Sequence, residues 1–251
     1  MIRLEHDGAV GIVTLSHPPH NLIGDEFIDR YCTAQEDAVA AGARAILVRS
    51  DLRHFCAGAD VKALGPGDDG AASDPAAVLD RLESIPVPTV AAIHGAVLGG
   101  GFELALACDM IVAAESAQVG AVEVTLGLVP LLGAIQRLVA RAGPARAREI
   151  TMLGRRYRPA ELERLGVVNL VVPDAELEEA SMSLARQLAA GPTVALGVIK
   201  RVVNIAVNDG TKAADEALSG ELATMWASND VRRGTEAMFT DGPGTAVFEG
   251  N

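Results

Sequence analysis

The residues best suited to chemistry are two short glycine-rich stretches, Phe-Cys-Ala-Gly-Ala-Asp at 55–60 and Gly-Gly-Gly-Phe-Glu at 99–103. Each follows a short apolar run that is typical of a buried strand. Glycine and alanine let a ligand approach the main chain closely and use its free N–H groups. The second stretch also opens a helix, whose first N–H groups lack partners and carry the positive end of the helix dipole. Together they predict an oxyanion hole for a developing negative charge.

Two glutamates lie in otherwise apolar segments near these glycines. Glu103 belongs to the helix-like segment 102–108, and Glu123 lies within the mainly apolar run 119–130. Removal from water raises the pKa of a carboxyl, which suits it to proton transfer, and two such groups can share one water. The alternative is that Glu103 lies on an exposed helix face and Glu123 in a solvated loop. The presence of both beside the glycine stretches favours proton transfer.

Other kinds of site find less support. The glycines at 95–101 lack the G-x-G-x-x-G order, and Gly101 and Phe102 stand where a Walker motif has Lys and Ser or Thr, so nucleotide binding is disfavoured. A tight strand-to-helix turn is the other explanation of these glycines. The scattered histidines have no metal-binding spacing, and no G-x-S-x-G elbow indicates a serine hydrolase. The basic cluster 155–158 is more typical of a solvated turn than of an anion site.

The elements that must position these residues alternate along the chain. Residues 3–15 alternate around Asp7-Gly8, which predicts an antiparallel hairpin. A helix-like segment and then a short, continuous apolar run follow, as expected of a strand covered on both faces. The predicted strands are 45–49, 89–93, 110–114 and 167–172, and the predicted helices are 25–41, 101–108 and one from about 133. This alternation predicts an α/β fold.

The last part of the chain has a different pattern. Three helix-like segments, 176–190, 192–207 and 211–228, follow the last predicted strand, and the glycine-rich tail 241–251 is not expected to be helical. We therefore predict a catalytic core over 1–190 and a helical oligomerisation module over 191–251. The run 65–75, rich in Gly, Asp and Pro, is expected to be a mobile surface loop beside the site.

Composition excludes several classes of protein. A net charge of −12 disfavours binding to nucleic acid or anionic membranes. The odd set of Cys32, Cys56 and Cys108, without C-x-x-C spacing, predicts neither a disulfide framework nor a zinc ribbon and fits a cytoplasmic protein. The charged N-terminus has no signal-peptide pattern. The apolar run 87–114 holds too many charged and glycine residues for a transmembrane helix.

Several of these motifs, in this order, resemble the enoyl-CoA hydratase/isomerase family, also called the crotonase family. The resemblance extends over nearly the whole chain. It rests on five segments: His-Pro-Pro-His-Asn-Leu (17–22), Phe-Cys-Ala-Gly-Ala-Asp (55–60), the run 88–109, Glu-Val-Thr-Leu-Gly-Leu-Val-Pro (123–130) and Leu-Gly-Arg (153–155). It implies a crotonase-like spiral of ββα units with a C-terminal helical module.

The resemblance also implies roles for individual residues. The N–H groups of Ala59 and Gly100 would bind the oxygen of a coenzyme A thioester and stabilise its enolate. Glu103 and Glu123 would hold the water that adds across the 2,3 double bond of a 2-trans-enoyl-CoA, giving a 3-hydroxyacyl-CoA without a separate cofactor or metal. The coenzyme A moiety would contact Ala57, Ala59, Asp60, Val61 and Lys62, with Arg53 as a further candidate for its phosphates. The family implies a homotrimer or a dimer of trimers.

Two departures from the family pattern affect these expectations. Leu131 stands where the family's hydratases usually have a glycine that helps to position the water, so it is expected in the water or acyl pocket. The tail lacks the family's basic run that can meet phosphates from a neighbouring subunit. An enoyl-CoA isomerase or related enolate chemistry, and a non-catalytic acyl-CoA-binding protein, are therefore the alternatives to a hydratase.

Overall fold

The centre of the fold is a six-stranded sheet. The structure, a computed structural model, describes residues 1–60 and 74–251. The six strands of this sheet lie in the order β1-β2-β3-β4-β6-β8, antiparallel between β1 and β2 and parallel elsewhere. Their bounds are β1 Ile2–Asp7, β2 Val10–Leu15, β3 Ala45–Ser50, β4 Thr89–Ile93, β6 Met110–Ala114 and β8 Leu170–Val172. The predicted hairpin is confirmed, and Gly8 has the positive φ (58°) that its turn requires.

A second, smaller sheet supports the site. It pairs β5 (Ala96–Leu98) with β7 (Gln118–Gly120) in parallel. Single bridges extend it on both sides, from Cys56 to Val97 and from Val119 to Tyr157. The chain therefore brings the first glycine-rich stretch, the strand before the second, and the basic cluster 155–158 into one short row of extended segments.

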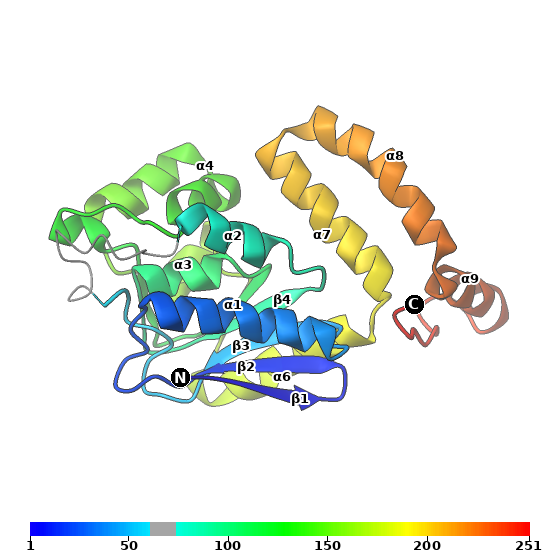
Figure 1. Ribbon diagram of the computed structural model, residues 1–251, viewed down its shortest axis with the longest axis horizontal. Helices are drawn as coiled ribbons and strands as arrows, with labels where there is room; N and C mark the ends of the chain where they lie inside the picture. Colours follow the sequence, from blue (N-terminus) through cyan, green and yellow to red (C-terminus); the bar gives the residue numbers. More distant parts are fainter. Residues whose placement is uncertain (61–73) are drawn as a thin grey trace.

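Helices cover both faces of the main sheet (Figure 1). Helix α6 packs on one face, while α1, α3 and α4 contribute to the cluster on the other. The helices are α1 Asp25–Ala40, α2 Pro75–Glu83, α3 Gly100–Leu106, α4 Ala134–Leu153, α5 Pro159–Arg164, α6 Leu177–Ala190, α7 Thr193–Asn208, α8 Thr211–Ala227 and α9 Asn229–Thr240, with 3-10 turns η1 Glu123–Leu126 and η2 Asp174–Glu176. Successive residues of β3 and β4 alternate between the two clusters, so these strands are apolar on both faces, as the sequence predicts.

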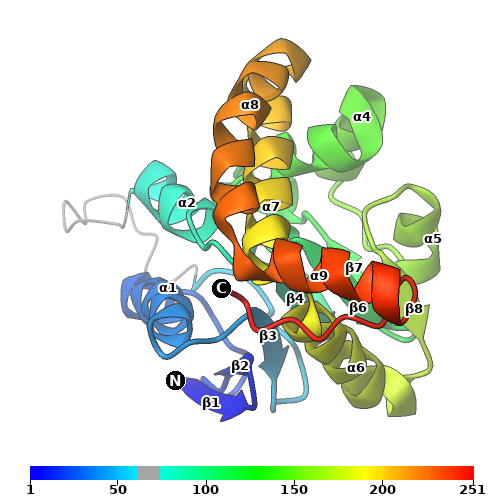
Figure 2. The same cartoon turned by 90° about the vertical axis from the view of Figure 1, so that its right-hand side faces the viewer.

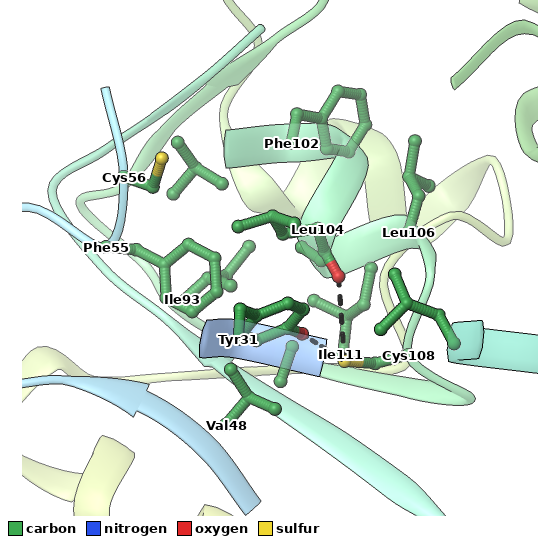
Figure 3. Close-up of a cluster of buried hydrophobic side chains, with 14 of the residues drawn as sticks. Tyr31, Val48, Phe55, Cys56, Ile93, Phe102, Leu104, Leu106, Cys108 and Ile111 are labelled. Atoms are coloured by element: carbon green, nitrogen blue, oxygen red, sulfur yellow. Dashed lines mark hydrogen bonds between the residues drawn. The ribbon is translucent and has the colours of Figure 1, made fainter. Parts of the chain in front are cut away.

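Helix α3 is fixed by the core beneath it (Figure 3). All seven of its residues are buried, and Phe102 and Leu104 pack in the same cluster as Tyr31 and Phe55. The Tyr31 hydroxyl lies 3.9 Å from Cys108 Sγ, just beyond the end of α3. Such packing leaves the helix little freedom to move, so the groups at its N-terminus have a defined position.

Helices α7 to α9 extend away from the two sheets (Figures 1 and 2). Arg44 ties the start of α7 to the core by donating to Gly191 O (2.6 Å) and Thr193 Oγ1 (2.8 Å), and Lys200 Nζ lies 2.9 Å from Asp109 Oδ2. The three predicted C-terminal helices are confirmed, and α9 is an additional one. The division at residue 190 into a core and an oligomerisation module stays a prediction.

The sequence analysis did not predict two short helices of the core, α2 and α5. Each has fewer than ten residues, which is too short for a clear helical periodicity. Nearly all of the predicted loop 65–75 lies outside the described residues. No single helix among those that the structure describes is long and apolar enough to cross a membrane. One pair, 174–190 with 193–208, meets the criterion together but is bent by 106°.

Candidate active site

Helix α3 buries the first of the two predicted carboxyls. Gly99 precedes the helix with φ of 52°, a conformation that favours glycine, and turns the chain sharply from β5 into α3. The turn leaves Glu103 in the first turn of a fully buried helix, where it is only 3% exposed. The alternative of an exposed helix face is therefore wrong, and the expected removal of the Glu103 carboxyl from water is confirmed.

The loop before α4 holds this carboxyl in place. Glu103 Oε1 accepts the backbone N–H groups of Leu132 (2.7 Å) and Ala134 (3.1 Å). Gly133, between them, has φ of 87°, which lets both N–H groups converge on one oxygen. Burial raises the pKa of Glu103 to about 7, helped by the charge of Glu123 and opposed by these hydrogen bonds. Near neutral pH the carboxyl is thus poised between its two protonation states.

Glu123 is the first residue of η1, and its carboxyl lies beside the glycine turn. Both carboxyl oxygens are buried, and neither has a hydrogen-bond partner among the described residues. Burial raises its pKa. A methyl group placed on Gly99 would lie 3.4 Å from Glu123 Oε1, so this carboxyl rests against the turn that begins α3. Unpaired buried oxygens of this kind are suited to bind a ligand or a water.

The two predicted oxyanion amides also lie together. Ile23 bridges to this loop by donating its N–H to Gly58 O (3.0 Å) and accepting from Asp60 N (2.8 Å), which leaves the N–H of Ala59 outside the bridge. Gly100 is the first residue of α3, so its N–H has no helical acceptor. A Cβ built on Gly100 would lie 3.8 Å from Ala59 N. The structure therefore brings these two main-chain donors side by side.

Asn21 supports this loop, although the sequence analysis gave it no role. It is fully buried, and its Nδ2 donates to Phe55 O (2.8 Å) while its Oδ1 accepts from His17 N (2.6 Å). Its main-chain oxygen accepts from Cys56 Sγ (2.9 Å). An asparagine after two prolines was the available signal, because asparagine tolerates the positive φ of 53° found here.

Ala57 and Leu131 also belong to the predicted site. Ala57 donates its N–H to His20 O (3.0 Å), while Val61 and Lys62 lie outside the described residues. Leu131 is half exposed and directly precedes Leu132, whose N–H holds Glu103. It is one of the exposed apolar side chains of the segment 124–135, which are Val124, Leu126, Leu128, Val129, Leu131 and Ile135. No group of His, Cys, Asp and Glu side chains suited to a metal occurs within residues 1–60 and 74–251.

This arrangement supports proton transfer next to a stabilised oxyanion. Two adjacent amide N–H groups can donate hydrogen bonds to a carbonyl oxygen that gains negative charge. Two buried carboxyls with raised pKa values can exchange protons with the same ligand. The ligand would need a carbonyl group and a carbon or oxygen atom that gains or loses a proton.

Comparisons with known proteins agree with this chemistry. The family model for enoyl-CoA hydratase/isomerase matches residues 5–242. A probable enoyl-CoA hydratase of Bacillus subtilis (strain 168) is 36% identical over 195 residues, covering 75% of this chain and 76% of the relative. A carnitinyl-CoA dehydratase of Proteus mirabilis (strain HI4320) is 38% identical over 200 residues, covering 71% and 77%.

Comparison with solved structures also points to the enoyl-CoA hydratase/isomerase family. A crystal structure of enoyl-CoA hydratase subunit I from Geobacillus kaustophilus HTA426 superposes with a TM-score of 0.93 at 35% identity, covering 100% of this chain and 98% of that one. The predicted α/β crotonase fold is confirmed by this likeness.

Proposed function

Because the chain belongs to the enoyl-CoA hydratase/isomerase family, we propose that it is an enoyl-CoA hydratase that adds water syn across the 2,3 double bond of a 2-trans-enoyl-CoA. The observation that carries this proposal is the position of two buried carboxyls around the Gly99 turn, whose next residue provides one of two adjacent amides. The product is a 3-hydroxyacyl-CoA. The coenzyme A is part of the substrate, and the reaction needs no separate cofactor.

The amides of Ala59 and Gly100 act on the thioester oxygen. When water adds to the β-carbon, negative charge moves to this oxygen and an enolate forms. Two N–H donors that lie side by side in the folded protein stabilise this charge with little reorganisation, and one such donor contributes about 2.7–4 kcal/mol to lowering a barrier. The packing of α3 against the core keeps Gly100 in place.

Glu103 and Glu123 divide the proton transfers. The carboxylate form of Glu103, fixed by two backbone N–H groups, accepts a proton from the water as its oxygen bonds to the β-carbon. The protonated form of Glu123, favoured by its burial, donates a proton to the α-carbon of the enolate. The hydroxyl of the water joins the β-carbon, its other proton moves to Glu103, and Glu123 supplies the proton that reaches the α-carbon. A proton then passes from Glu103 to Glu123, directly or through solvent, before the next turnover.

A panel of trans-2-enoyl-CoA thioesters of different length and branching tests this proposal, with the loss of conjugated absorbance as the readout. We expect turnover of at least one thioester, and 3-hydroxyacyl-CoA as the product. Tight binding of every thioester without turnover would instead identify an acyl-CoA-binding protein.

An enoyl-CoA isomerase is the second candidate, because Leu131 occupies the position of the hydratases' usual glycine. Its branched side chain would keep water out while one glutamate moves a proton between carbon atoms. Parallel assays with 3-enoyl and 2-enoyl thioesters separate the two reactions. We also propose a cytoplasmic homotrimer, or dimer of trimers, assembled through α7 to α9, whose exposed apolar side chains include Ile199, Val203, Leu222, Trp226 and Phe239.

A further inference from the structure

The turn that holds the Glu103 carboxyl receives little support from its own segment. Nearly all residues of 124–131, which precede the turn, are exposed. Gly133, the N-cap of α4, has no side chain with which to cap the helix, and a glycine loses more conformational freedom than any other residue when it is fixed. The two N–H groups beside Gly133 can therefore stay on Glu103 only if another part of the fold holds this turn.

The side chain of Arg137 packs directly against Gly133. A Cβ built on Gly133 would lie 2.1 Å from Arg137 Nη1 and 3.1 Å from Cδ1 of Leu79, a residue of α2. The guanidinium group and this leucine thus fill the space that a side chain at position 133 would need. Arg137 also donates its backbone N–H to Gly133 O (3.1 Å). The arginine therefore limits the movement of the turn through both its side chain and its main chain.

Glu83 fixes the guanidinium group of Arg137. Arg137 Nη2 donates to Glu83 Oε1 (2.7 Å), and the arginine side chain is only 14% exposed. Glu83 is the last residue of α2. Arg81, also on α2, ties this helix to α1 by donating to Glu36 (2.7 Å) and Asp29 (2.8 Å). A series of contacts thus leads from α1 through α2 and Arg137 to the turn.

Arg137 acts on Glu103 through the backbone. Among residues 1–60 and 74–251, no ion pair or hydrogen bond joins the two side chains. The charged groups near them come from three elements: Glu123 on η1, Glu83 on α2 and Arg141 on α4. Burial and the charge of Glu123 raise the pKa of Glu103, whereas the backbone N–H groups lower it. Loss of these N–H groups would leave both raising effects less opposed.

We propose that Arg137, fixed by Glu83, is a positioning residue that keeps the turn at Gly133 in the conformation that directs two backbone N–H groups at Glu103. The arginine thereby keeps part of the Glu103 population in the carboxylate form near neutral pH. The kinetic consequence of this role rests on the proposed function, because it takes Glu103 as the base. The titration of Glu103 itself does not, because it is a property of the protein without substrate.

Two measurements test this role in R137M, R137K and E83Q. The first is titration of the Glu103 carboxyl by NMR, in protein that carries glutamate labelled with ¹³C at the carboxyl group and without any thioester; E103Q identifies the signal by its loss. The second is the pH dependence of kcat/KM on the best enoyl thioester. R148M is the matched control, because Arg148 is an exposed arginine of the same helix.

We expect the titration of Glu103 to move upward by about one pH unit in R137M, since the loss of one charge-assisted hydrogen bond changes an equilibrium about tenfold. The rise of kcat/KM should move by the same amount, with kcat about fivefold lower at pH 7 and KM little changed. R137K and E83Q should show smaller shifts in the same direction. A lysine keeps the charge opposite Glu83 but has no planar group to place against Gly133. R148M should match the wild-type protein.

An unchanged titration of Glu103 in folded R137M would overturn the proposal, because a merely structural role would lower activity equally at every pH. If R137M does not fold, as judged by thermal unfolding, R137K and E83Q decide the question. An upward shift in either supports the role, and no shift in both overturns it. If no thioester is turned over, the proposed function fails, and the NMR titration still decides the role of Arg137.

Discussion

The carboxyl of Glu123 lies close enough to that of Glu103 for its charge to raise the pKa of Glu103. The two residues come from different elements, a buried helix and a 3-10 turn, and only Glu103 is held by backbone N–H groups. Two like charges in one buried site cannot both ionise easily, so their pKa values separate. This difference between a fixed carboxyl and an unpaired one supports the proposed division of acid and base roles.

Replacement of either glutamate is expected to abolish most turnover. E103Q and E123Q each remove a proton-transfer group, which typically contributes 10²–10⁴-fold, and leave the coenzyme A contacts in place. Steady-state kinetics should show kcat lowered by about this factor with a small change in KM. E179Q, at an exposed position on α6, is the control. Rates within twofold of wild type in E103Q or E123Q would refute the role given to that residue.

Stability is expected to depend on pH through Glu103. Its folded pKa, about 7, is above the usual value of 4.5, so the folded state holds a proton that the unfolded state has released between these values. Stability is therefore highest below about pH 4.5 with respect to this group and falls as the pH rises to about 7, by on the order of 3 kcal/mol. E103Q removes this loss. Urea unfolding should show that the free energy of unfolding of E103Q, relative to that of wild type, is greater at pH 8 than at pH 5. An equal difference at both pH values would contradict the raised pKa of Glu103.

Activity is expected to follow the same titration. Glu103 must be a carboxylate to accept a proton, so kcat/KM should rise with pH through about 7 and level off above it. A pH–rate profile of the wild-type protein on its best thioester checks this rise. A flat profile from pH 5 to 8 would remove Glu103 as the base.

Leu131→Gly is expected to raise hydratase activity. The wild-type side chain is half exposed beside the loop that holds Glu103, and its removal gives water more access. We expect a severalfold gain in kcat on short enoyl thioesters, and L128G, at another exposed leucine of the same segment, is the control. No gain on any chain length would show that Leu131 does not restrict water.

The adjacent glycines Gly100 and Gly101 are expected to respond differently to alanine. A Cβ on Gly101 would lie 2.2 Å from Cys56 O, a backbone atom, whereas one on Gly100 meets the flexible end of Ile23 at 2.9 Å. G101A should lower the free energy of unfolding by about 1–3 kcal/mol or more, as overpacked cores do. G100A should keep most of its stability and lose kcat, because the methyl group crowds the oxyanion position. Thermal unfolding and kinetics on both variants check this; equal losses of stability would contradict it.

Much of the fold follows from local patterns in the sequence. Continuous apolar runs such as 89–93 and 110–114 predict strands covered on both faces, and the structure places successive residues of β4 and β6 in opposite clusters. Short elements could not be predicted in this way. Helix α5 and the bridge from Val119 to Tyr157 depend on contacts between distant segments, which no local periodicity encodes.

The candidate site was likewise predictable only in part from the sequence. The types of its residues, Glu103 and Glu123 in apolar surroundings and glycines at 99–101, are visible in the sequence because burial of a carboxyl and close approach of backbone are properties of individual positions. The sequence by itself therefore determined which groups are available for chemistry. Only the tertiary structure decided how these groups are combined. Ala59 adjoins Gly100, Leu132 and Ala134 hold Glu103, and Glu83 pairs with Arg137. Each of these relationships joins segments that pack together only after the chain has folded.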